Sequence, residues 1–176
     1  MKPYYLLTED HRVMHRVTLT GKEVTEPFHS LPPISVISVS NTTPQQYMDW
    51  FIKPRPIISD DMKNILAMYQ PHMECKRIDL VDHQQRSQYT YWAFTPPTLD
   101  CLSSDAEFYP DGRLKKLVLN REKIKRDHFF TILGIMEPYH VISLDAAESL
   151  LRRGLNGFIL EDAMISDGGT HESTLG

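Results

Sequence analysis

Two stretches of this chain share a pattern that describes how a strand passes into a helix. The first, IISDDMKNIL, runs from Ile57 to Leu66, and the second, VISLDAAESL, runs from Val141 to Leu150. In both, apolar residues precede a serine, and an aspartate and further apolar residues follow it. Serine is a favoured N-cap, and negative charge is stabilised at the start of a helix. The pattern predicts two strand-to-helix joints and leaves open whether they arose by duplication or by the same capping solution.

The helix after each joint has a predicted end. The first helix should stop near Gln70, because the proline that follows disfavours helical geometry before it. The second helix should end at Gly154, and Arg152 and Arg153 are favourably placed at the negative end of its dipole. An anion bound at either helix start is not expected, because the aspartates of both stretches would repel it.

Most of the remaining chain has the alternation and the turn residues of β-structure. Strands are expected at 3–7, 33–40, 74–82, 88–95, 128–136, 140–143 and 157–162, with a hairpin at 106–120 around Pro110-Asp111-Gly112. Residues 8–31 are interpreted as a second strand or an extended arm, followed by a loop. Pro54 and Pro56 exclude a central strand, so the segment before Ile57 should be an edge strand or an extended lead-in. Residues 120–127 should form a helical turn or a loop.

These elements predict an α+β fold, a mostly antiparallel sheet with two main helices packed on it. A chain of 176 residues has the length of one domain and can bury a core without metal or disulfide staples. We therefore expect a single α+β domain over residues 1–165. The small polar residues of 166–176 predict a disordered tail.

Composition indicates the environment of the protein. The chain is 41% hydrophobic and 24% charged, as soluble globular proteins are. It has no apolar run of about 18 residues that would span a membrane, and its first residues lack the apolar stretch of a signal peptide. We therefore expect a cytoplasmic protein. Cys75 and Cys101 form no Cys-x-x-Cys pair, and two free thiols are favoured over a disulfide between them.

A nucleic-acid partner is not expected. The net charge is −4, whereas phosphate neutralisation requires clustered Lys and Arg. The densest basic run, from Arg113 to Arg126, is interpreted as a solvated strand edge rather than a phosphate-binding patch. The aromatic run from Tyr89 to Trp92 has no basic groove around it, so core packing is favoured over base stacking. No Walker or Gly-x-Gly-x-x-Gly sequence is present, so no nucleotide cofactor is predicted.

A metal site is considered at His11 and His15, which are four residues apart. On a helix the two side chains would share one face and could bind zinc. The residues around them alternate as in a strand, which would separate them by about 13 Å. We therefore predict no metal site.

A cysteine or aspartate centre is the catalytic alternative. Cys101 or the adjacent Asp100 would need a histidine brought close by the fold. The available histidines are His83, His128 and His140. A buried cysteine beside a strand is the commoner case, and the acidic residues of the chain are better explained as helix-start and turn charges. We therefore predict no catalytic residue, and a small cytosolic hydrolase or transferase remains the alternative function.

Several parts of the chain together resemble one known family. They are YYLL, IKPRPIISDDMKNILAMY, AFTPPTLDCLSSDAEFYPDGRLKKLVLN and FFTILGIMEPYHVISLDAAESLLRRGLNGFILEDA. Their order is similar to that of the Imm11-type immunity proteins of bacterial polymorphic toxin systems. The family's Leu-Asp-x-x-x-Ser element is matched here by Leu99, Asp100 and Ser103 or Ser104. The resemblance covers residues 3–163, and the chain departs from it at 8–31 and at the cysteine that follows Asp100.

The resemblance implies a non-enzymatic protein that binds a cognate toxin domain and blocks it. It does not assign a functional role to any individual residue of this sequence. The negative net charge would suit a basic toxin. A generic scaffold whose sheet edge pairs with a partner strand is a further alternative. We place the partner surface on the acidic and aromatic hairpin of Asp105, Glu107, Tyr109 and Asp111, because an exposed loop can vary without disturbing the core.

Overall fold

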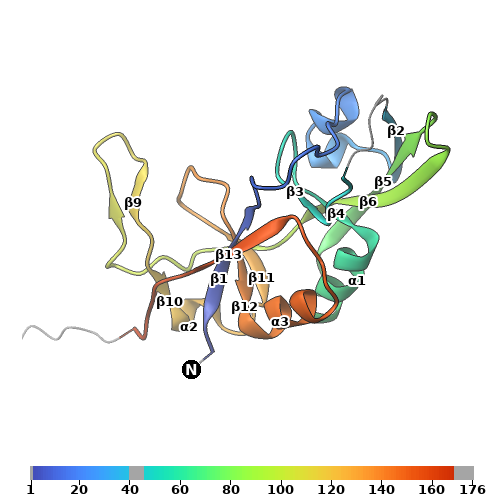
Figure 1. Ribbon diagram of the computed structural model, residues 1–176. Helices are drawn as coiled ribbons and strands as arrows, with labels where there is room; N and C mark the ends of the chain where they lie inside the picture. The colour runs from blue at the N-terminus through green and yellow to red at the C-terminus, as the bar shows by residue number, and fades with distance from the viewer. Residues whose placement is uncertain (1, 40–45, 169–176) are drawn as a thin grey trace, which may run out of the picture.

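The computed structural model describes residues 2–39 and 46–168, and Figure 1 shows their arrangement. The chain forms two five-stranded sheets, and two helices pack against each other where the sheets meet. These helices are α1 (Asp60–Tyr69) and α3 (Leu144–Arg152). A third helix, α2 (Arg121–Ile124), is only four residues long.

One sheet contains strands from both ends of the described chain, and we call it the terminal sheet. Its strands, in order, are β13 (Phe158–Asp162), β1 (Tyr4–Glu9), β12 (His140–Ser143), β11 (Phe129–Ile132) and β7 (Thr98–Leu99). Neighbouring strands are antiparallel except β11 and β7, which are parallel.

The other sheet, which we call the middle sheet, is built from residues between the ends. Its strands, in order, are β2 (Ile34–Val39), β5 (Glu74–Asp82), β6 (Ser87–Thr95), β4 (Ile57–Ser59) and β3 (Trp50–Phe51). Only β2 and β5 run parallel. An arm of residues 11–31, with the 3₁₀ helices η1 (Lys22–Val24) and η2 (Phe28–Ser30), covers one face.

Two short strand pairs complete the fold. The hairpin of β8 (Glu107–Phe108) and β9 (Leu114–Lys116) projects from the body of the molecule (Figure 1). The parallel pair of β10 (Leu119–Asn120) and β14 (Ile165–Ser166) lies beside the terminal sheet.

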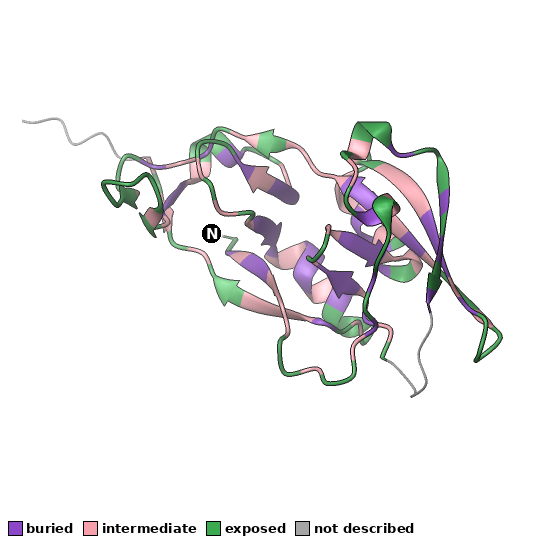
Figure 2. Cartoon of the chain, turned by 90° about the horizontal axis from the view of Figure 1, so that it is seen from above, coloured by how far each residue is buried: buried purple, intermediate pink, exposed green. Residues whose placement is uncertain are grey.

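The central strands of both sheets are buried on two faces, and this explains why they have continuous apolar runs. In β6, Tyr91 enters the cluster under the arm, and Phe94 enters the cluster around the two helices. In β11, Phe129 joins that helix cluster, whereas Phe130 joins a third cluster on the far side of the terminal sheet. Figure 2 shows the buried residues concentrated along these central strands and helices.

Both predicted joints are confirmed. Ser59 Oγ accepts a hydrogen bond from the Met62 amide at 3.2 Å, and Ser143 Oγ accepts one from the Ala146 amide at 3.3 Å. The first helix ends before Gln70 as expected. The strand-rich α+β character is also confirmed. The fold otherwise fits the expectation only loosely, because the strands divide between two sheets and three of the strand pairs are parallel.

Several local expectations are resolved by the structure. Of the stretch 8–31, Thr8 and Glu9 end β1, and residues 11–31 form an arm rather than a second strand. The strand expected at 128–136 ends at Ile132, because the chain turns through Gly134 at a positive φ of 88°. The segment before Ile57 contains the edge strand β3, as the two prolines require. The polar tail stays a prediction: Ser166 lies in β14, and residues 169–176 lie outside the described residues.

Candidate functional site

The β8–β9 hairpin is an exposed element with aromatic side chains near its turn. Tyr109 accepts a backbone hydrogen bond from Gly112 and donates one to Arg113, which closes the turn predicted at this position. Gly112 has a φ of 86°, a conformation that favours glycine. Phe108 and Tyr109 are 42% and 45% exposed, so the hairpin presents aromatic surface to solvent.

The acidic residues predicted on this hairpin are paired within it. Asp111 accepts a hydrogen bond from Arg113 at 2.6 Å, and Glu107 lies 3.3 Å from the Lys115 ammonium group. The Arg113 guanidinium also lies 5.5 Å from the centre of the Tyr109 ring. The hairpin therefore has little unpaired negative charge, and its distinctive surface is aromatic rather than acidic.

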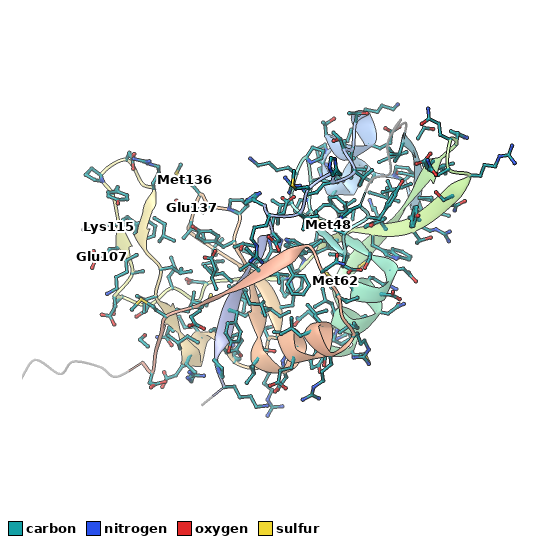
Figure 3. The ribbon with its side chains drawn as sticks, viewed as in Figure 1. Met48, Met62, Glu107, Lys115, Met136 and Glu137 are labelled. Carbon is teal, nitrogen blue, oxygen red and sulfur yellow. The ribbon has the colours of Figure 1, made fainter. Side chains whose placement is uncertain are left out.

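A second loop, residues 133–139, lies against the hairpin. The Leu114 amide donates to Glu137 Oε1 at 2.8 Å, and the Met136 sulfur lies within van der Waals range of the position a Cβ on Gly112 would take. Figure 3 shows Met136 and Glu137 beside the hairpin that carries Lys115 and Glu107. Met136 is 70% exposed. The loop thus adds an exposed apolar side chain to the aromatic surface of the hairpin.

We call the surface formed by these two loops the hairpin face. It is made up of Glu107, Phe108, Tyr109, Asp111, Leu133 and Met136. The structure brings three of the predicted residues, Glu107, Tyr109 and Asp111, together on it. Asp105 lies at the base of the hairpin, where it lines a cavity of about 480 Å³ together with Glu107 and Met164. Sequence reasoning missed Leu133 and Met136, because the segment 128–136 was interpreted as a single buried strand.

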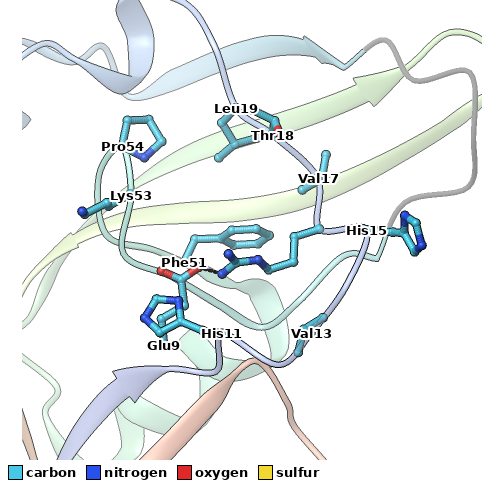
Figure 4. Close-up of a pocket in the computed structure, with 11 residues that line it drawn as sticks. Glu9, His11, Val13, His15, Val17, Thr18, Leu19, Phe51, Lys53 and Pro54 are labelled. Atoms are coloured by element: carbon cyan, nitrogen blue, oxygen red, sulfur yellow. Dashed lines mark hydrogen bonds and ion pairs between the residues drawn. The ribbon is translucent and has the colours of Figure 1, made fainter.

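A cavity of about 860 Å³ lies where β1 passes into the arm. Its walls come from Glu9, from the arm residues 11–19 and from the turn after β3 at Lys53 and Pro54 (Figure 4). Arg16 forms an ion pair with Glu9 in this wall. A smaller cavity of about 210 Å³ shares Glu9 and Lys53 and reaches Pro138. The two cavities extend from the arm to the loop that borders the hairpin face.

The histidines of the arm, His11 and His15, lie in irregular backbone outside any helix. Figure 4 shows the side chains of His11 and His15 on different sides of the cavity. No group of three or more metal-binding side chains occurs within residues 2–39 and 46–168. The arrangement is that of an irregular arm and not of a helix with two ligands on one face.

The cysteine and aspartate candidates lack the arrangement of a nucleophile and a base. Cys101 is fully buried in the cluster behind the terminal sheet. Burial raises the pKa of its thiol to about 11, which disfavours the reactive thiolate. Within the described part of the chain, neither Cys101 nor Asp100 forms a hydrogen bond with a histidine; His128 is bonded to Ser143.

The two helix starts are occupied by the protein's own groups. Ser59 Oγ donates to Asp49 Oδ1 at 2.6 Å, and Asp49 also accepts from the amide of Asn156 at 2.8 Å. At the second joint, Asp145 pairs with Lys2 at 2.6 Å. These contacts agree with the expectation that the joints are structural.

No family model matches this chain, and no curated protein matches it. Among the described residues, no helix is long and apolar enough to cross a membrane.

Proposed function

We propose that this protein is a non-catalytic binding protein that neutralises a cognate bacterial toxin domain, and that the hairpin face makes the contact. The proposal takes its function class from the sequence resemblance to immunity proteins. The observation that carries the choice of surface is the projecting hairpin, whose aromatic side chains are exposed and whose turn residue Gly112 lies beside the exposed Met136.

The hairpin face has the composition of a protein-binding surface. Aromatic and methionine side chains are enriched in interfaces, and aromatic anchors contribute most of the binding energy. Leu133 and Met136, on the loop that lies against the hairpin, are 54% and 70% exposed. Because Glu107 and Asp111 are already paired with basic side chains, we expect apolar contact rather than net charge to drive toxin binding.

The remainder of the fold supports this face as a rigid base. The two main helices pack on the sheets, and the hairpin is tied to the 133–139 loop through Leu114 and Glu137. A scaffold of this kind lets a loop surface vary while the core stays unchanged. The function implies a cytoplasmic location in a bacterium, where Cys75 and Cys101 would remain reduced.

The test is co-expression with the product of the neighbouring gene, which the proposal expects to encode a toxin domain. The wild-type protein should restore growth of cells that express the toxin and should co-purify with it. Combined Phe108→Ala, Tyr109→Ala and Met136→Ala substitutions should weaken binding at least about tenfold, because each removes an exposed anchor. Binding can be measured by isothermal titration with the purified toxin domain.

Met68→Ala is the matched control. Met68 is 63% exposed on α1, and Figure 1 shows α1 far from the hairpin, so the loss of Met68 should leave binding unchanged. A neighbouring product that is harmless to cells would refute the toxin-neutralising function. Full affinity of the triple variant would refute the hairpin face as the contact surface while leaving the function itself standing.

A further inference from the structure

The two five-stranded sheets end in strands that differ in how well they are protected from pairing with another chain. In the terminal sheet, β7 has two residues, and β13 carries the exposed acids Glu161 and Asp162. In the middle sheet, β3 has two residues and is buried. Short length, charge and burial are the usual protections of an edge strand. Three of the end strands therefore have such a protection.

The fourth end strand, β2, has none of them. It is six residues long, its sequence ISVISV has no charge, and its two prolines precede it rather than interrupt it. Ile34 and Val36 are each 58% exposed on its outer face. A long, uncharged strand with exposed β-branched side chains is a template for strand pairing.

The register of β2 shows which backbone groups face outward. The Arg77 amide donates to the Pro33 carbonyl, and Ile34 lies opposite Arg77 in the parallel ladder. In a parallel ladder, alternate residues direct both backbone groups to the same neighbour. Ser35 and Ile37 therefore pair with β5, whereas the N–H and C=O groups of Ile34, Val36 and Ser38 point away from it. Within the described residues these outward groups have no strand partner.

We infer that β2 is the pairing edge of a two-fold symmetric dimer, in which it runs antiparallel to β2 of a second copy. With Val36 on the two-fold axis, Val36 meets Val36 of the other copy and Ile34 meets Ser38. Each of these outward-facing pairs exchanges two backbone hydrogen bonds in an antiparallel ladder. The pairing joins the two middle sheets into one continuous sheet.

A second copy is the occupant that fits the charge of this edge. A two-fold axis brings identical residues near one another, so a charged edge strand repels its own copy. Glu161 and Asp162 would do so on β13, but β2 carries no charge. Since β2 is the one end strand among the described residues without protection, the pairing closes at two copies and does not propagate. This inference does not depend on toxin binding.

The test is sedimentation equilibrium of the full chain from low to high micromolar concentration. The average mass should rise from the monomer value of 20.4 kDa toward twice that value. Val36→Lys places like charges on the two-fold axis, and Val36→Pro removes an outward N–H without removing a bond to β5. Both variants should weaken self-association at least about tenfold. The control is Met68→Lys, which places the same charge on the exposed surface of α1, away from β2. This variant should dimerise as the wild-type protein does.

Hydrogen exchange of the wild-type protein gives a reading that does not depend on variant stability. The amides of Ile34, Val36 and Ser38 should become protected as the concentration rises. A wild-type protein that keeps the monomer mass at high concentration would overturn the inference. A dimer that forms equally well in both Val36 variants would also overturn it. The same holds if hydrogen exchange at the amides of Ile34, Val36 and Ser38 does not change with protein concentration.

Discussion

His140 is a histidine enclosed by aromatic rings where the two sheets meet. It is 4% exposed, and the ring centres of Trp50, Phe94 and Phe129 lie 5.1, 5.7 and 5.8 Å from its own. Burial lowers the pKa of His140 to about 4 from an ordinary value of 6.5. The side chain is therefore neutral in the folded protein over the whole range in which an exposed histidine titrates.

This burial makes stability depend on pH. Between pH 6.5 and 4 the unfolded chain binds a proton at His140 that the folded chain does not, so acidification favours unfolding. Above pH 6.5 His140 is neutral in both the folded and the unfolded chain, so its protonation does not reduce the unfolding free energy. Near pH 4 the reduction of the unfolding free energy approaches about 3 kcal/mol. His140→Phe should flatten the dependence of the unfolding free energy on pH in this window, as measured by urea unfolding at several pH values.

An exposed histidine provides the control for that series. His72 lies in the turn after α1 and is exposed, so His72→Gln should keep the wild-type dependence on pH. If the wild type and His140→Phe lose stability equally between pH 6.5 and 4, His140 is not the group responsible.

The two strand-to-helix joints use the same cap with different supporting contacts. At the first, Ser59 also donates to Asp49, which binds the amide of Asn156 and so ties the joint to the segment after α3. At the second, Ser143 Oγ lies 2.8 Å from Nδ1 of His128. The local sequence pattern is shared, but each serine has a different partner, which lies 10 residues before Ser59 and 15 residues before Ser143.

Removing either cap should destabilise the protein. Ser59→Ala and Ser143→Ala each leave a helix-start amide without its acceptor, and each should lower the unfolding free energy by about 1–2 kcal/mol. Chemical unfolding followed by circular dichroism measures the change. Ser104→Ala, at an exposed serine that caps no described helix, should have almost no effect. If Ser59→Ala or Ser143→Ala lowers the unfolding free energy no more than Ser104→Ala does, the caps contribute little to stability.

The core around α1 and α3 joins the two sheets into one unit. It contains Trp50 and Phe94 from the middle sheet, Phe129 and Ile142 from the terminal sheet, and Leu150 from α3. The helices are further linked by a contact of 2.5 Å between the Tyr69 and Ser149 hydroxyl groups. Because both sheets share this cluster, we expect them to unfold together.

A cavity in the shared core tests that expectation. Leu150→Ala should lower the unfolding free energy by about 2–5 kcal/mol, because Leu150 is fully buried. Hydrogen exchange should show β5 and β12 losing protection at the same denaturant concentration in this variant. The adjacent Leu151 is 56% exposed, so Leu151→Ala should change stability far less. Separate loss of protection in the two sheets would contradict a shared core.

The sequence by itself determined the local elements of this protein. Serine caps, the two prolines before Ile57 and the glycine turn at 112 act through neighbouring backbone, so they predict joints, an edge strand and a hairpin without knowledge of the fold. The aromatic run from Tyr89 to Trp92 predicted core packing, and Tyr91 is buried in the cluster under the arm, whereas Tyr89 is 38% exposed. The sequence did not show where the turn at Gly134 would interrupt an apolar run.

Only the tertiary structure decided which strands pair and which side chains share a surface. Alternation of apolar and polar residues predicts the two faces of a strand but not which strands lie beside it. The division into two sheets and the parallel pairing of β2 with β5 therefore could not be predicted from this pattern. For the same reason the place of Met136 beside Gly112 could not be predicted. These contacts join residues distant in sequence, and packing of the whole chain selects them.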